Sequence, residues 1–419
     1  MSRTILKTAF AASLGLGLAA PSFADEITVW AWDKNFNVAS MEKAAELYIA
    51  NNPGTKISVV EMGRPDIEQK LHTMLSSGMT KALPDIVLIE DYASQKYLTA
   101  YPDAFAPLSD DIDFTKFIPY KVEITSNNGK VYGLPFDSGV TGVFVRTDIL
   151  KKAGYTVADL ENITWDRYIE IGKDVLKKTG TQFIAIDPNY LSIMRIIMHT
   201  NGAWFTDEKG EVSLAGNKDL ASAMDLTKEM FTSGIARTTG GWNNWVQANL
   251  NGNVATIPTG VWFTQTIVSG GDQSGNWAVV PTPRLDEEGT VNAANLGGSS
   301  WYVLESSPER DEAIKFMKET LGDNSDLYQK LLDENNVVAS YTPSFTGEAY
   351  NKTHEYLGGQ KIFADFAKWM EDITPINYGM YTIEAEAAII AQMPAFMAGE
   401  ISAEQALEKA QIRIARQIR

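Results

Sequence analysis

Strand and helix patterns alternate through the first part of the chain, from Ile27 to residue 90. The stretch "ITVWA" alternates as a strand does, and apolar residues at helical spacing follow from Ser40 to Ala50. A second strand, "KISVV", and a second helix, "DIEQKLHTMLSSG", come next. The run "IVLI" at 86–89 is apolar without interruption, which is typical of a parallel strand covered on both faces. This order predicts an α/β fold with an open, mostly parallel sheet.

The remainder of the chain predicts a second lobe and more than one crossing between the lobes. The 419 residues are enough for two cores. Two apolar runs flank Pro135–Gly139, which indicates a passage from one lobe to the other. The stretch "LGGSSWYVLESS" at 296–307 indicates a strand that crosses back, because a helical pattern follows it. Ligands of such sheets bind outside the carboxyl ends of the strands, and clefts between lobes are favoured pockets. We therefore expect the strand-end loops to carry the function.

The first 24 residues have the composition of a secretory signal peptide. Arg3 and Lys7 precede an apolar run, and Ser22-Phe23-Ala24 forms a small-x-small cleavage site. Cleavage there would leave a mature chain that starts at Asp25, with no cysteine nearby to carry a lipid anchor. The chain contains no cysteine, and no later apolar run approaches the length of a membrane helix. These features predict a protein of the Gram-negative periplasm without direct membrane insertion.

Charge and motif spacing exclude several classes of function. The formal net charge of −17 argues against nucleic acid and anionic lipid as partners. The three histidines are far apart, and "SDDIDF" lacks the glycine and distal glutamate of a calcium loop. The sequence contains no Gly-x-Ser-x-Gly elbow, no cysteine nucleophile and no Walker motif. We therefore expect no metal, no cofactor and no catalytic residue.

Most of the tryptophans stand in loops or at the ends of elements, beside glycine, asparagine and carboxylates. A sugar has apolar faces and a rim of hydroxyl groups, so an aromatic ring covers the face while carboxylates bind the rim. The aromatic candidates for a carbohydrate site are Trp32, Trp204, Trp242, Trp262 and Trp301. The acidic candidates are Glu90, Asp91 and Asp137.

Each of these residues also has a structural interpretation. A tryptophan packs well in a core, and we assign Trp165 and Trp369 to the core because they lie within helical patterns. Asp137 follows a proline and could cap a turn, whereas Asp91 could cap a helix. Trp262 is the strongest aromatic candidate, since Thr259-Gly260 places it at the exit of a predicted strand.

Several fragments resemble the extracellular solute-binding proteins of ABC sugar importers, the group that includes maltose-binding protein. They are "EITVWAW", "LPDIVLIED", "GKVYGLPFDSGVTGVFVRTDIL", "ATIPTGVWF", "LGGSSWYVLESSPERDEAIKFMKETL" and "ISAEQALEKAQIRI". The resemblance implies a two-lobe periplasmic-binding-protein fold with a hinge of two or three strands and a sugar in the interlobe cleft. It also implies an inner-membrane ABC permease as partner. The expected N-terminal lobe is 25–138 plus 296–345, and the expected C-terminal lobe is 139–295 plus 346–419.

The resemblance also assigns residues to the ligand site. It carries over to Trp32, Glu90, Asp91, Asp137, Trp204, Trp262, Gly297 and Gly298, and less directly to Trp242 and Tyr378. The family has Gly-Pro-Trp where this chain has Gly260-Val261-Trp262, so we expect a looser turn than the family's, with the position of the tryptophan kept.

The function predicted from these features is that of a monomeric receptor. It would capture a carbohydrate, such as a small oligosaccharide or glycoside, and deliver it to the permease without catalysis. Two alternatives stay open. One is a receptor for a non-sugar solute such as a polyol. The other is a secreted carbohydrate-active enzyme, in which Asp91 and Asp137 would flank the cleaved bond.

Overall fold

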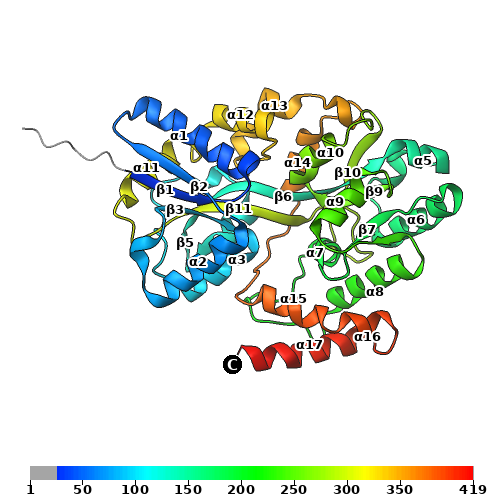
Figure 1. Ribbon diagram of the computed structural model, residues 1–419. Helices are drawn as coiled ribbons and strands as arrows, with labels where there is room; N and C mark the ends of the chain where they lie inside the picture. The colour runs from blue at the N-terminus through cyan, green and yellow to red at the C-terminus, as the bar shows by residue number, and fades with distance from the viewer. Residues whose placement is uncertain (1–25, 419) are drawn as a thin grey trace, which may run out of the picture.

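The first lobe contains a parallel sheet with β1 between its two neighbours (Figure 1). The computed structural model describes residues 26–418, so the predicted signal peptide 1–24 and Asp25 lie outside the described residues. The strands are β1 (Glu26–Ala31), β2 (Lys56–Glu61) and β3 (Ile86–Glu90). The helices between and after them are α1 (Ala39–Asn51), α2 (Arg64–Ser77) and α3 (Asp91–Ala100). Both β2 and β3 run parallel to β1, which confirms the predicted alternation of strand and helix.

One long strand, β6 (Gly133–Arg146), joins the two lobes. Its first half pairs with β11 (Asn295–Val303), and its second half pairs with β9 (Thr256–Gly260) and β10 (Trp277–Pro281). Because β11 also pairs with β3, the seven strands named so far form one sheet that spans both lobes. The two crossings predicted at 130–150 and 296–307 are therefore confirmed.

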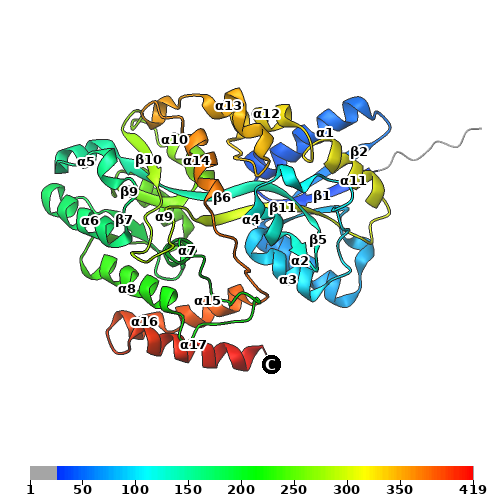
Figure 2. The same ribbon diagram turned by 180° about the vertical axis from the view of Figure 1, so that it is seen from behind.

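A third segment crosses beside β6. The Ser138 N–H donates to the Val338 carbonyl at 3.0 Å, and the Ser340 N–H donates to the Phe136 carbonyl at 2.8 Å. This segment leads from α12 (Ser325–Asn335), which packs on α1, to α13 (Glu348–Asn351) and α14 (Ile362–Glu371). Three crossing segments thus lie at the hinge. Two of them, β6 and β11, run through the centre of the view in Figure 2.

The second lobe is rich in helices. It contains the parallel pair β7 (Ile184–Ile186) and β8 (Ala236–Thr238) and the helices α6 (Trp165–Thr179), α7 (Ser192–His199) and α8 (Lys218–Thr232). Helix α5 (Thr147–Ala153) packs against α6, β6 and β10. The C-terminal helices α15 (Thr382–Ile390), α16 (Met393–Met397) and α17 (Ala403–Gln417) form one edge of this lobe (Figures 1 and 2).

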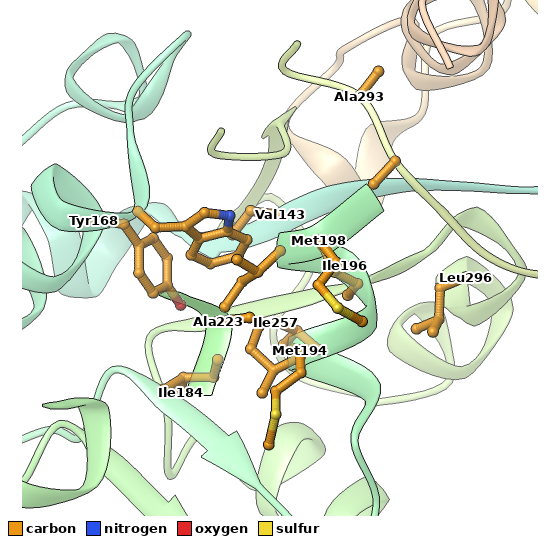
Figure 3. Packing of buried hydrophobic residues seen from close by; sticks show 14 of the residues in the cluster. Val143, Tyr168, Ile184, Met194, Ile196, Met198, Ala223, Ile257, Ala293 and Leu296 are labelled. Atoms are coloured by element: carbon orange, nitrogen blue, oxygen red, sulfur yellow. The ribbon is translucent and has the colours of Figure 1, made fainter. Parts of the chain in front are cut away.

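Large side chains fill the core of the second lobe. Figure 3 shows Tyr168 within this core, and its hydroxyl bonds the Thr256 hydroxyl at 2.5 Å. Trp165 is fully buried next to this tyrosine, as predicted. Trp369, also assigned to the core, is only partly buried and packs on the core from its edge.

Candidate ligand-binding site

A cluster of aromatic rings lies at the strand ends of the second lobe. Trp242 begins α9 (Trp242–Leu250), which follows β8, and Trp262 follows β9. The Trp242 ring stacks on Trp245 with centroids 5.3 Å apart and lies 6.0 Å from Trp262. Phe263 packs edge-on beneath Trp242 and Trp262. Trp242 is 55% exposed, so the cluster offers an open aromatic surface to solvent.

The glycine turn at the end of β9 determines where the Trp262 indole lies. A Cβ atom on Gly260 would collide with Nε1 of Trp262, so only glycine lets the indole fold back against the strand end. Nε1 then donates a hydrogen bond to the Leu296 carbonyl of β11 at 2.8 Å. Trp262 is partly buried, with its edge fixed against a crossing strand and its ring beside the exposed Trp242.

The end of β7 adds polar groups beside this cluster. Asp187 accepts a hydrogen bond from the Gly241 N–H at 2.6 Å, which ties it to the loop that leads into Trp242. Tyr190, in the same loop as Asp187, is 46% exposed. The sequence analysis missed both residues, because β7 has only three residues and is too short to recognise by periodicity.

Two sequence-predicted residues lie at the strand ends of the first lobe. Trp32 follows β1 and is partly buried against the first-lobe core, and Glu90 is the last residue of β3. The Glu90 carboxylate forms an ion pair with Arg64 at the start of α2. Tyr92, two residues after β3, contacts the second lobe, so this edge of the sheet faces that lobe.

Asp91 and Asp137 belong to a buried polar network at the hinge. Lys121 of α4 (Pro119–Ile124) donates to Asp91 Oδ1 at 2.5 Å and to the Ser299 carbonyl at 3.0 Å. The Ser299 hydroxyl in turn donates to Asp137. Asp91 has no exposed surface, and a Cβ atom on Gly298 would come within 2.5 Å of its Oδ2.

Burial raises the pKa values of both carboxyl groups. Desolvation raises the pKa of Asp91 to about 6, against the opposing effect of the Lys121 ammonium, and Asp137 adds a smaller upward effect. Desolvation also raises the pKa of Asp137 above its usual value, again against Lys121. Through their hydrogen bonds with Lys121 and Ser299, the two carboxyl groups link α3 and α4 to the crossing strands.

Trp204 and Tyr378 pack against the first lobe. Tyr92 of α3 stacks on Trp204 with centroids 5.4 Å apart and meets Tyr378 edge-on at 5.0 Å. The Trp204 Nε1 donates to the Thr382 hydroxyl at 2.9 Å, which fixes the indole from the other side. All three rings are buried, so in this conformation they join the two lobes directly.

A buried cation completes this interlobe contact. The Arg195 guanidinium of α7 lies 4.8 Å from the Tyr92 ring centroid and 5.2 Å from that of Tyr190, and it forms an ion pair with Glu386. The sequence analysis missed Arg195 because it stands within the apolar helical run "SIMRIIMH". The only available signal was a charge among apolar residues.

Trp301 does not belong with the other candidate residues. It has no exposed surface and packs in the first-lobe core, 5.6 Å from Phe136. It lies within β11, where it is paired with Leu88 of β3, and side chains alternate between the two faces of a strand. Its prediction as a ligand contact is wrong for this conformation, because its position on β11 directs the indole into the core.

Gly297, by contrast, is partly exposed and lies at the Trp262 indole. A Cβ atom on it would come within 3.2 Å of Trp262 Nε1, so the glycine permits this close approach.

Two further properties concern residues 26–418 as a whole. Among them, the structure places no three His, Asp or Glu side chains so that they could hold a metal ion. None of the helices in this range is both long and apolar enough to cross a membrane.

Two lobes linked by three crossing segments, with an aromatic surface at strand ends beside the crossing strands, define the class of two-lobe binding proteins. Residues 43–355 match the family described as bacterial extracellular solute-binding proteins, and the chain belongs to this family.

Individual relatives agree with this assignment. The chain is 46% identical to a lactose-binding protein of Rhizobium radiobacter over 95% of its own length and 94% of the relative's. Its fold is similar to that of the GacH receptor of Streptomyces glaucescens, with a TM-score of 0.77 and 19% identity over 94% of this chain and 98% of that one. The galacto-N-biose-/lacto-N-biose I-binding protein of Bifidobacterium longum gives a TM-score of 0.74 and 18% identity over 95% and 98%. These two likenesses confirm the predicted two-lobe fold.

Proposed function

We propose that the protein is the periplasmic receptor of an ABC importer and that it captures a disaccharide of the lactose type. The observation that carries the proposal is the open surface of Trp242 and Trp262, which suits the apolar face of a sugar ring. The choice of a lactose-type ligand rests on the lactose-binding protein that is 46% identical over nearly the whole chain.

The proposed site uses groups from both lobes. A sugar ring packs on Trp242 beside Trp262, and lone pairs of the Asp187 carboxylate and the Tyr190 hydroxyl bind its hydroxyl groups. Trp32 and Glu90 contact the sugar from the first lobe. A ligand held by both lobes favours the closed state, which is the form that the permease would receive.

The hinge residues have a supporting role in this proposal. Asp91, Asp137 and Gly298 keep the crossing strands in place, and Trp204 and Tyr378 close the space between the lobes. The lobes are proposed to comprise 25–138 plus 296–345, and 139–295 plus 346–419. The receptor acts as a monomer after removal of its signal peptide.

We propose binding without catalysis. A glycosidase needs two carboxyl groups that flank the cleaved bond and reach the substrate. Asp91 and Asp137, the pair that an enzyme would use, are buried and bound to Lys121 and Ser299. The family and the relatives found are named as binding proteins, which supports the same proposal.

Isothermal titration calorimetry with the mature protein tests this function. We expect saturable binding of lactose, weaker binding of maltose, and no binding of a polyol such as sorbitol. Chromatography of the same mixtures is expected to show unchanged lactose. A folded protein that binds no galactoside at millimolar concentration, or that releases galactose, would overturn the proposal.

A further inference from the structure

Two side chains from different lobes hold opposite sides of one peptide unit in β11. The carbonyl of Leu296 accepts a hydrogen bond from Trp262 Nε1 at 2.8 Å. The N–H of the same peptide, that of Gly297, donates to the Tyr92 hydroxyl at 2.8 Å. In a trans peptide the C=O and N–H point in opposite directions. Trp262 and Tyr92 therefore approach this peptide from opposite sides.

The peptide lies where the pairing of β6 with β11 is interrupted, packed closely between Gly139 and Gly260. Gly297 and Gly298 have φ values of +90° and +88°, a region that glycine enters without strain. The pairing of β6 with β11 shifts register between Asn295 and Gly298, so the regular ladder is interrupted here. The two side-chain hydrogen bonds consequently do much to set the orientation of the Leu296–Gly297 peptide.

Tyr92 is itself rigidly placed. Its ring is buried between Trp204, Tyr378 and the Arg195 guanidinium, all from the second lobe. Its backbone belongs to the first turn of α3 in the first lobe. Second-lobe groups thus hold the Tyr92 ring, and with it the hydroxyl that accepts the Gly297 hydrogen bond.

We propose that Tyr92 is a positioning residue for Trp262. By accepting the Gly297 hydrogen bond, it orients the peptide whose carbonyl anchors the indole, and so it sets the tilt of the aromatic surface on which the sugar packs. Because Tyr92 comes from the first lobe and Trp262 from the second, this one peptide links the two lobes at that surface. This inference rests on the proposed function, in which Trp262 is part of the sugar site.

The test compares two tyrosine-to-phenylalanine variants in ligand-free protein. Tyr92→Phe removes the hydroxyl that holds Gly297. The matched control Tyr302→Phe removes a buried hydroxyl that joins the same two elements, because Tyr302 of β11 donates to Ser94 of α3 at 2.9 Å. Both proteins are labelled with 5-fluorotryptophan, and Trp262→Phe identifies the fluorine resonance of Trp262.

We expect the Trp262 resonance to shift or broaden in Tyr92→Phe and to stay in place in Tyr302→Phe. Lactose affinity should fall about 2- to 10-fold in Tyr92→Phe, the effect of one hydrogen bond. As the reciprocal measurement, Trp262→Phe should speed hydrogen exchange in the peptide that contains Gly297.

The outcomes separate this inference from the proposed function. An unchanged Trp262 resonance in Tyr92→Phe overturns the positioning role, whatever the affinity for sugar. Equal changes in both tyrosine variants also overturn it, since they would reflect general loosening of α3 on β11. A selective change in a protein that binds no galactoside supports the positioning role and rejects the lactose-type ligand.

Discussion

Trp242 and Trp301 are the same residue type in opposite surroundings, and they should respond differently to truncation. Trp242→Ala removes an exposed ring, so we expect lactose affinity to fall about 5- to 10-fold while the free energy of unfolding changes by about 1 kcal/mol or less. Trp301→Ala opens a cavity in the first-lobe core and should cost about 3–5 kcal/mol. Calorimetry and urea unfolding measure the two effects. Loss of affinity in folded Trp301→Ala, with none in Trp242→Ala, would reverse the assignment.

Gly260 offers a second test at the scale of single atoms. In Gly260→Ala the new methyl group occupies the place of the Trp262 indole edge, so the indole must leave its hydrogen bond to Leu296. We expect lactose affinity to fall at least about 10-fold, since an aromatic contact and its orientation are lost together. Gly54→Ala is the control, because a methyl group there meets nothing within 4 Å. Calorimetry showing equal affinities for the two variants would contradict this role of Gly260.

For residues that follow a recognisable strand, the sequence could predict the position at the strand exit. The strand before Trp262 ends in Thr-Gly, which marks such an exit, and the structure places the partly buried tryptophan there. Trp301 also follows glycines, but the glycines lie inside β11, and a pattern of neighbours does not reveal which face of a strand is covered. Asp187 and Arg195 have no such signal, since their place depends on contacts distant in sequence.

At the scale of elements, we expect the buried network between α3, α4 and the crossing strands to make the stability of the fold depend on pH. The pKa of Asp91 is raised from 3.8 to about 6 in the folded protein, mainly by desolvation. The folded state therefore binds this proton more tightly than the unfolded state does. The contribution of Asp91 to the free energy of unfolding consequently increases as the pH falls from 7 toward 4. Asp137 contributes in the same direction, while Lys121 opposes both shifts.

Asp91→Asn tests this account, because the amide cannot titrate. Relative to the variant, the wild-type protein should gain about 2 kcal/mol in free energy of unfolding between pH 7 and pH 4.5. Urea unfolding at both pH values, at constant ionic strength, measures the difference. A wild-type protein that instead loses stability relative to Asp91→Asn on acidification would show that the ion pair with Lys121 outweighs desolvation.

Elements with a clear apolar run could be predicted, and elements without one could not. The run at 86–89 predicted a buried strand, and the two apolar runs within 130–150 predicted the crossing that β6 makes. The third crossing segment, at 338–340, consists of a few residues without periodicity, and its hydrogen bonds to β6 join residues that are far apart in the sequence. An element could be predicted when its apolar pattern was long enough to recognise, whatever its role at the hinge.

At the scale of the whole molecule, side chains from both lobes meet on two sides of the hinge. Tyr92 packs on Trp204, and Lys96 of α3 lies 3.9 Å from the Glu384 carboxylate of α15. Elsewhere, the Asn336 amide donates to Gln265 at 2.5 Å. The two-lobe arrangement followed from the order of the motifs along the chain. The contacts between the lobes could not be predicted from that order, since each pair is separated by many residues and depends on the angle at which the lobes meet.

Removal of the Tyr92 side chain should therefore open the molecule. Tyr92→Ala deletes the ring that joins the lobes and the hydroxyl that holds Gly297, so the equilibrium shifts toward separated lobes. We expect a larger radius of gyration in small-angle X-ray scattering without ligand, and a return to the wild-type value with saturating lactose. The apparent affinity should fall in proportion to the lost closed fraction. Tyr101→Ala, which truncates a tyrosine that stacks on Tyr97 within the first lobe, is the control and should scatter as the wild type does. If Tyr92→Ala and wild-type protein scatter identically without ligand, the aromatic contact does not hold the lobes together.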